Sequence, residues 1–237
     1  MKKTITLILL FAFVAIAQAQ TKRTVHIWKA GHETAVENVD SITFSEEVEL
    51  PSDTSYVDLG LSVKWATCNV GASKPEEGGN FYAWGETATK DYYGWSSYKF
   101  YVSRSTFSKY SDEDGKTILS SDDDVATAVL GKAWRMPTYD ELKELVNSCT
   151  WTWTTLNGVN GYQVKSDVNG NSIFLPAAGD YDEEKIEDVG MLGGYWGKTK
   201  PSASSEADYI FFSARTHSVS TDYRYAGWSV RPVLNVE

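Results

Sequence analysis

One stretch, WRMPTYDELKELV (residues 134–146), constrains the fold more than any other part of the chain. Pro137 cannot lie inside a helix, but it fits just before a helix start. Thr138 and Glu141 have the spacing of a capping box, in which each side chain accepts a hydrogen bond from a free backbone N–H group. Apolar residues then recur at helical spacing, at Leu142, Leu145, Val146 and Cys149. The stretch predicts an extended segment ending at Met136, a turn, and a helix whose apolar face packs on a sheet.

The remaining patterns predict mostly strands. Apolar and polar residues alternate from Tyr56 to Trp65, which is typical of a strand, and Gly60 can divide it into a hairpin. A short helix at residues 121–131 is expected to start with Ser121 and Asp124 at capping-box spacing. Further strands are expected at residues 81–84, 150–155, 209–214 and 223–233, a hairpin at 162–175 around Asn169-Gly170, and loops at 87–115 and 180–200. Two helices, many antiparallel strands and long loops indicate the α+β class.

The N-terminus has the features of a signal peptide. Lys2 and Lys3 precede an apolar run, and Ala17-Gln18-Ala19 forms an A-x-A cleavage site, so residues 1–19 are expected to be removed. The apolar run is too short to span a bilayer, and no cysteine follows it to carry a lipid anchor. We therefore expect an exported protein, in the periplasm or at the cell exterior, with no membrane insertion after cleavage.

Two segments follow the predicted signal peptide. Residues 20–50 are expected to form a small hairpin and a linker, because apolar residues flank the Ala30-Gly31 turn. Another short strand is expected at residues 39–44. Residues 51–237 are long enough for one domain with its own core.

Charge and aromatic content bound the partners. The formal net charge is −10 and the isoelectric point is about 4.8, which disfavours nucleic acid and anionic membranes as partners. Aromatic residues make up 14% of the chain, including 9 Trp and 14 Tyr, more than one core of this size requires. Some of these rings are expected on a surface. Core positions are expected for rings in strand patterns, at Trp134, Trp151, Trp153, Phe174 and Trp228.

The two cysteines, Cys68 and Cys149, have two interpretations. Export permits a disulfide between them, and the predicted strand and helix positions are expected to bring their Cα atoms within bridging distance. Alternatively, both are buried thiols that behave as small apolar residues. Two cysteines and three scattered histidines do not form a zinc site.

A set of ordered segments carries a resemblance. These are WATCNVGA (65–72), FYAWGET (81–87), WRMPT (134–138), LVNSCTWTW (145–153), GYQV (161–164), NSIFLPAAG (171–179), GGYW (193–196) and GWSVRPV (227–233). Together they resemble the Fibrobacter succinogenes major paralogous domain of exported gut-bacterial proteins, over about residues 56–237. The resemblance implies a C-type-lectin-like fold, related to that of formylglycine-generating enzymes. It implies architecture more than activity.

Catalytic and metal motifs are not found. The chain lacks the close cysteine pair of formylglycine-generating enzymes, the E-P-N, Q-P-D and W-N-D motifs of calcium-dependent lectins, and a G-x-S-x-G segment. Asp122, Asp123 and Asp124 are better explained by a helix start than by calcium. We therefore expect no catalytic residues, no cofactor and no metal.

The expected ligand face lies in the loops after Gly179. The resemblance places the ligand face of similar folds in this C-terminal region. Its expected contacts are five aromatic residues and one polar anchor: Tyr181, Tyr195, Trp196, Tyr223, Tyr225 and Arg224. The first functional hypothesis is a non-enzymatic binding or adhesion module for a glycan or a cell-surface protein. The alternatives are a structural subunit that pairs through its N-terminal hairpin, and a hydrolase that uses the acidic residues 180–184.

Overall fold

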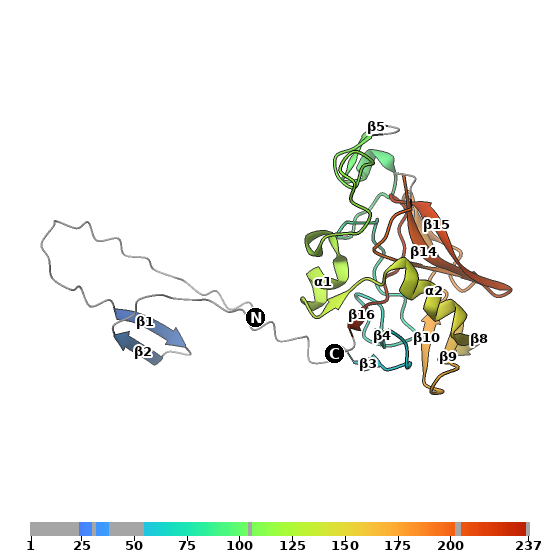
Figure 1. The fold of residues 1–237 in the computed structure, drawn as a ribbon, viewed down its shortest axis with the longest axis horizontal. Coiled ribbons are helices and arrows are strands. Elements are labelled where there is room, and N and C mark those ends of the chain that lie inside the picture. Colours follow the sequence, from blue (N-terminus) through green and yellow to red (C-terminus); the bar gives the residue numbers. More distant parts are fainter. Residues whose placement is uncertain (1–23, 30–31, 38–54, 104–105, 202–204, 236–237) are drawn as a thin grey trace, which may run out of the picture. The chain divides into compact units, whose positions relative to one another are not determined.

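The computed structural model describes residues 24–29, 32–37, 55–103, 106–201 and 205–235. The chain divides into two compact units, Met1–Glu47 and Val48–Glu237. The first unit contains β1 (Thr24–Lys29) and β2 (His32–Glu37), which pair antiparallel (Figure 1) and confirm the predicted hairpin. The predicted signal peptide, the linker before Ser55 and the expected strand at residues 39–44 lie outside the described residues.

A four-stranded antiparallel sheet joins the beginning and end of the second unit. Its spatial order is β3 (Tyr56–Val57), β4 (Val63–Ala66), β16 (Val233–Asn235) and β7 (Trp134–Arg135). The strand predicted from Tyr56 to Trp65 is divided as expected, with Gly60 at φ +69° between β3 and β4.

Arg231 fixes the chain just before β16. Its buried guanidinium donates to the carbonyl oxygens of Ala66, Thr67 and Phe174 at 2.8–3.0 Å and to Oδ1 of Asn69 at 2.8 Å. One side chain therefore joins the C-terminal segment to the region around β4 and to β10 (Ser172–Pro176). Because a buried guanidinium requires hydrogen-bond acceptors, these four bonds explain how the charge is accommodated.

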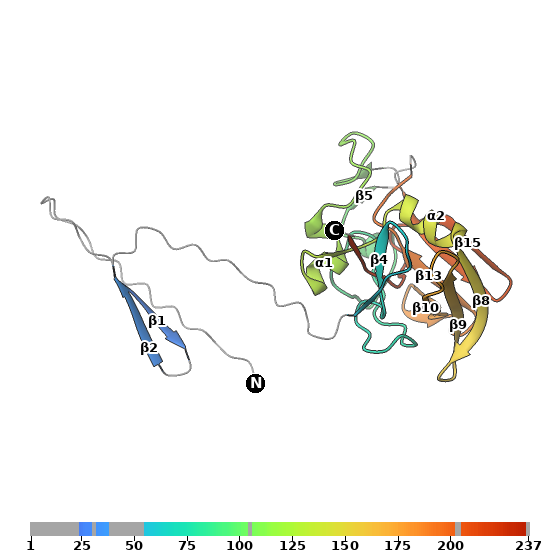
Figure 2. The ribbon, with the colours of Figure 1, turned by 60° about the horizontal axis from the view of Figure 1, so that its bottom comes forward.

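The longer helix begins as predicted. α2 (Tyr139–Asn147) has Thr138 as its N-cap, and both bonds of the capping box with Glu141 are present. Leu142 and Leu145 are buried, and Figure 2 shows α2 beside β15 (Thr216–Tyr223) and β8 (Cys149–Leu156). The helix ends before Cys149, so the expectation that Cys149 lies on its apolar face is wrong.

The shorter helix starts later than predicted. A 3-10 turn, η2 (Ser121–Asp123), precedes α1 (Val125–Leu130). The N-cap is Asp124, whose carboxylate accepts from the backbone N–H groups of Ala126 and Thr127. The same carboxylate accepts from Met136 N and from the Lys198 ammonium, so it joins α1 to the segment before α2.

A three-stranded antiparallel meander follows α2. It consists of β8 (Cys149–Leu156), β9 (Val159–Ser166) and β10 (Ser172–Pro176). The strand after α2 and the hairpin around Asn169-Gly170 are confirmed. Phe174 is buried as expected, whereas Trp151 and Trp153 are half-buried on one face of β8.

Residues 180–200 do not form the predicted loop. They contain the hairpin of β11 (Asp180–Asp182) and β12 (Lys185–Glu187), and then β13 (Leu192–Trp196). β13 pairs with β14 (Glu206–Ser213), and β14 pairs with β15 (Thr216–Tyr223). The expected strand over residues 223–233 is also wrong for most of its length, since only its end contributes to β16.

The long segment at residues 87–115 is ordered where it is described. It includes a 3-10 turn, η1 (Trp95–Ser97), and a short pair of strands, β5 (Tyr101–Ser103) and β6 (Thr106–Phe107). The strand predicted at residues 81–84 is reduced to one bridge between Tyr82 and Trp228.

Two groups of buried side chains form the core of the second unit. One is rich in aromatic rings, with Trp84, Tyr93, Tyr98 and Tyr110 from the 81–110 segment and Trp196 from β13. The other lies between α2 and the meander and is mostly aliphatic, with Leu59, Leu142, Leu145, Val164 and Phe212. These antiparallel strands and two α-helices place the described part of the chain in the α+β class. Within that part, no helix has the length and apolar character needed to cross a membrane.

Candidate functional site

Three of the six expected ligand contacts lie in the core. Tyr195 is 2% exposed, and Trp196 and Arg224 are 0% exposed, so the expectation that they face a ligand is wrong. Tyr195 and Trp196 belong to β13 rather than to a loop. The Tyr195 hydroxyl donates to the Pro176 carbonyl at 2.9 Å, and Trp196 Nε1 donates to the Tyr82 carbonyl at 2.8 Å. Their polar atoms are thus satisfied inside the protein, as buried Tyr and Trp require.

Arg224 lies between two aromatic rings. Its guanidinium carbon is 4.9 Å from the Trp84 ring centroid and 4.8 Å from that of Phe107. Nη2 donates to the Tyr110 carbonyl at 2.8 Å, and Nε donates to the Glu206 carbonyl at 3.3 Å. Burial lowers the pKa of this guanidinium. Arg224 therefore anchors the chain after β15 to the 81–110 segment, and it positions the residues on either side.

Tyr223 and Tyr225 extend away from the buried side chain between them. Tyr223 is 46% exposed and Tyr225 is half-buried, and their rings stack with centroids 5.6 Å apart. Trp95 contacts both rings, with centroid distances of 5.7 Å to Tyr223 and 4.6 Å to Tyr225. Tyr101 stacks on Trp95 at 5.4 Å. We call these four residues, Trp95, Tyr101, Tyr223 and Tyr225, the aromatic patch.

Sequence reasoning missed Trp95 and Tyr101. They lie in a segment rich in Tyr and Trp, YYGWSSYKFY (residues 92–101), which was expected to be a loop. The density of rings in a polar segment was the available signal. It could not show that this segment contacts the end of β15, more than 100 residues later in the chain.

Tyr181 lies beside the turn that carries Tyr225. Its backbone exchanges hydrogen bonds with Gly227 at 2.9 and 3.1 Å. A Cβ atom at Gly227 would lie 2.7 Å from the Tyr181 Cβ, so glycine is required at this close approach. The half-buried Tyr181 ring packs on Tyr93 and Phe81, with centroid distances of 4.6 and 6.1 Å. Tyr181 is therefore a neighbour of the aromatic patch rather than a member of its ring stack.

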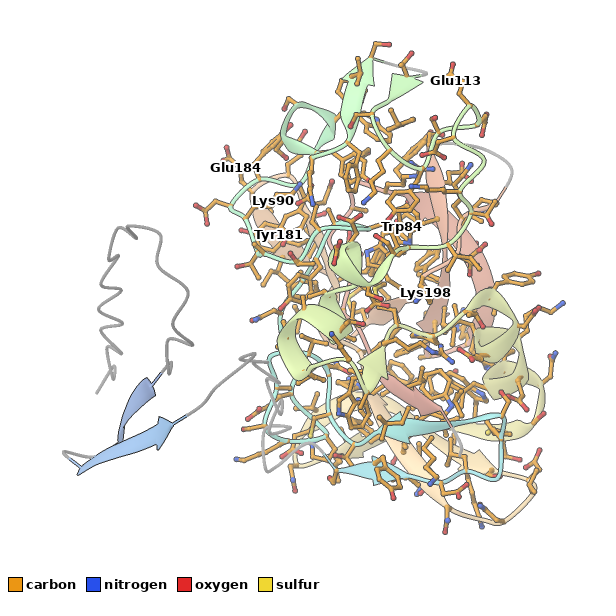
Figure 3. The ribbon with its side chains drawn as sticks, turned by 60° about the vertical axis from the view of Figure 1, so that its left-hand side comes forward. Trp84, Lys90, Glu113, Tyr181, Glu184 and Lys198 are labelled. Atoms are coloured by element: carbon orange, nitrogen blue, oxygen red, sulfur yellow. The ribbon has the colours of Figure 1, made fainter. Side chains whose placement is uncertain are left out.

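Acidic groups surround the aromatic patch. Burial raises the pKa of the Tyr225 hydroxyl, and the negative charges of Asp182 and Asp222 raise it further. Burial also raises the pKa of Asp222, whose carboxylate accepts from Trp228 Nε1 at 2.7 Å. Figure 3 shows Tyr181, Glu184 and Lys90 toward one side of the molecule. Apolar ring faces thus lie near carboxylate oxygens that can accept hydrogen bonds.

The acidic residues 180–184 are spread over a hairpin. Asp182, Glu183 and Glu184 are exposed, and Glu183 pairs through its backbone with Tyr93. Burial raises the pKa of Asp180 to about 6, with a contribution from Asp188. The described residues contain no group of three or more His, Cys, Asp or Glu side chains placed to hold a metal ion. Asp182, Glu183 and Glu184 therefore offer hydrogen-bond acceptors on the surface of this hairpin.

Both cysteines are free thiols, so the expected disulfide is not formed. Cys149 is the first residue of β8 and is buried, with Ser166 as its strand partner. Cys68 is half-buried in the segment after β4, where its thiol lies 3.7 Å from the Thr67 hydroxyl. The prediction assumed that Cys149 continued the face of the helix, and the helix ends too early for that.

Comparison with protein-family models, with curated proteins and with solved structures finds no match to this chain.

Proposed function

We propose that this protein is an exported, non-enzymatic binding module that recognises a glycan through the aromatic patch. The observation that carries the proposal is the stack of partly exposed Trp and Tyr rings. Sugar rings present apolar C–H surfaces and hydroxyl groups, so aromatic faces beside carboxylate acceptors match both parts of such a ligand. The N-terminal basic, apolar and A-x-A sequence supports export.

The rigid support of the patch strengthens the proposal. Trp95 comes from the 87–115 segment and Tyr225 from the turn after β15. Arg224, next to Tyr225, binds that segment through Phe107 and the Tyr110 carbonyl. Binding residues on loops that a packed scaffold holds in place lose little conformational freedom when a ligand binds. We also propose that the scaffold has the C-type-lectin-like fold, which the ordered segments from WATCNVGA to GWSVRPV support.

A glycan array probed with the exported chain tests the proposal. Tyr223→Ala is the sharpest variant because this side chain is the most exposed of the patch. We expect binding to fall at least about tenfold, equivalent to about 1.4 kcal/mol, with the free energy of unfolding changed by less than about 0.5 kcal/mol. Tyr56→Ala is the matched control, because Tyr56 is an equally exposed tyrosine on β3.

The outcomes are distinct. If Tyr223→Ala, Tyr225→Ala and Tyr181→Ala all keep the binding of the unmodified chain, the aromatic patch is not the ligand site. If no glycan on the array binds, glycan recognition itself is contradicted.

A structural role is the second candidate. Among the described residues, β1 and β2 pair only with each other, so each strand has an outer edge available for another strand. Such an edge can recruit a partner by β-augmentation. Loss of assembly on deletion of residues 24–37, with glycan binding unchanged, would favour this role.

A further inference from the structure

A hollow of about 510 Å³ lies between the start of α2, the segment that joins β13 to β14, and the middle of β15. Its size is within the range of small-molecule sites. Its lining is mixed: apolar side chains of Ile118, Tyr139, Pro201 and Val219 stand beside hydroxyl and carboxyl groups of Thr117, Asp140, Thr199, Asp208, Ser220 and Thr221. None of these residues belongs to the aromatic patch.

Asp208 is the unusual residue in this lining. It lies on β14, where its neighbours Ala207 and Tyr209 belong to the aromatic core. Because side chains alternate along a strand, Asp208 extends to the opposite side, toward α2. It is 5% exposed, and its carboxyl group bonds to the Thr199 side chain, whose hydroxyl oxygen accepts from Tyr139 N at 2.7 Å.

The Asp208 carboxylate has no cationic partner among the described residues. Burial raises its pKa to about 6, and the Thr199 hydroxyl opposes part of that rise. The other two buried aspartates differ, since Asp123 pairs with Lys99 and Lys109, and Asp124 pairs with Lys198. A buried carboxylate without a counter-charge is costly near pH 7, and a bound cation would remove that cost.

The other charges around the hollow favour a cationic ligand. Asp140, in the first turn of α2, is exposed and adds a second negative charge. Lys200 is buried, but its ammonium already pairs with Asp112 at 3.1 Å. The wall from β15 is uncharged and consists of Val219, Ser220 and Thr221.

We propose that this hollow binds a small ligand that carries a protonated primary amine beside hydroxyl groups, which is the chemistry of an amino sugar. The ammonium group would pair with Asp208, and the ligand hydroxyls would meet the exposed hydroxyl groups of Thr117 and Ser220. The half-exposed ring of Tyr139 and the side chain of Ile118 supply apolar contacts at the rim. This site is separate from the aromatic patch and does not depend on it.

Titration of the full chain with glucosamine, glucose and N-acetylglucosamine, followed by NMR chemical shifts, tests the proposal. We expect glucosamine at millimolar concentration to perturb residues around the hollow, and the two uncharged sugars to bind at least about tenfold more weakly. Asp208→Asn keeps the shape of the side chain and removes its charge, so it should lower the affinity for glucosamine at least about tenfold. Asp122→Asn, an exposed aspartate on η2, is the matched control and should leave binding unchanged.

The pH dependence provides a second readout. Glucosamine should bind more weakly as the pH falls below 6, because protonation of Asp208 removes the charge that pairs with the amine.

Asp140→Asn distinguishes the two carboxylates that line the hollow and should lower the affinity for glucosamine less than Asp208→Asn does. The proposal is wrong if glucose binds as well as glucosamine, if Asp208→Asn leaves glucosamine binding intact, or if no sugar perturbs the hollow. Tyr223→Ala should leave glucosamine binding here unchanged, which separates this site from the proposed glycan site.

Discussion

The Trp95 ring meets the Tyr225 ring edge to face, with the two centroids 4.6 Å apart. This contact joins a segment early in the domain to the turn that follows its last long strand. It brings together rings that neither segment could hold in place alone. Phe107 packs on Trp95 and also contacts the buried Arg224, so the patch is connected to the core through these two residues.

Arg224→Ala should destabilise the fold. The change leaves the Tyr110 carbonyl without its donor and removes two cation–π contacts, so we expect a loss of about 2–4 kcal/mol in the free energy of unfolding. Urea denaturation measures the effect. Arg215→Ala, at the exposed turn between β14 and β15, is the control and should change stability by less than about 0.5 kcal/mol. Equal midpoints for both variants would contradict the anchoring role of Arg224.

Leu145→Ala should cost about 2–5 kcal/mol, because the side chain is fully buried between α2 and the neighbouring strands. Thr138→Ala should cost about 1 kcal/mol through loss of the N-cap. Val129→Ala, at an exposed position of α1, serves as the control. Thermal melts should show the largest fall in melting temperature for Leu145→Ala, a smaller fall for Thr138→Ala and the smallest for Val129→Ala. A wild-type melting temperature for Leu145→Ala would show that Leu145 does not face the core.

Both cysteines should react as free thiols without added reductant. We expect a thiol assay on the unfolded, non-reduced protein to report both Cys68 and Cys149. In the folded protein, Cys149 should react with iodoacetamide far more slowly than Cys68. Burial raises the pKa of Cys149 to about 11 and limits its thiolate fraction. A protein that yields no free thiol until it is reduced would disprove this arrangement.

Asp208→Asn should stabilise the protein near pH 7 by about 1–3 kcal/mol. The folded pKa of about 6 exceeds the ordinary value of 3.8, so the folded state binds more protons between these values. The buried Asp208 charge therefore lowers the free energy of unfolding by its full amount above pH 6, and this destabilisation disappears as the pH falls toward 4. Urea midpoints of wild type and variant at pH 7 and pH 4 measure the difference, with Asp122→Asn as the control. A variant less stable than wild type at pH 7 would contradict the unpaired charge.

Asp123→Asn should lower the free energy of unfolding at pH 7, whereas Asp208→Asn should raise it. Burial alone would raise the pKa of Asp123, but hydrogen bonds from Lys109, Tyr110 and Lys99 outweigh it and lower the value to about 2. Its stabilisation is present above pH 4 and is lost as the pH falls through 2, so the variant should lose about 1–3 kcal/mol at pH 7 and less in acid. Denaturation curves across this range provide the test. A loss that stays constant down to pH 2 would show that charge is not its cause.

Local chemistry was sufficient to predict several elements. The capping box of Thr138 and Glu141 starts a helix, and the turn at Asn169-Gly170 forms a hairpin. Both depend on residues close together in the sequence, and both occur as expected. β15 was not predicted, because THSVSTDY (residues 216–223) has little apolar alternation and becomes a strand by pairing with β14. Tertiary pairing overrides local preference in such segments.

The candidate site was predicted only in part. Residue type predicted ligand contacts at Tyr195, Trp196, Tyr223 and Tyr225, but it could not show which rings are buried. β13 places the first two in the core, whereas Tyr223 and Tyr225 flank the buried Arg224. The sequence did not single out Asp208, because its importance comes from its burial without a cationic partner among the described residues.

The position of β16 also determines the order in which the domain can assemble. This strand lies between β4 and β7, so β4 pairs only with β3, and β7 lacks its partner, until Val233 to Asn235 are in place. The contacts of Arg231 with Ala66 and Phe174 close equally late. Long-range pairing of this kind slows folding, because the entropy of closing a large loop is lost before the contacts form. Because β16 is an inner strand of this sheet, we expect the sheet to be completed late in folding, after the local hairpins have formed.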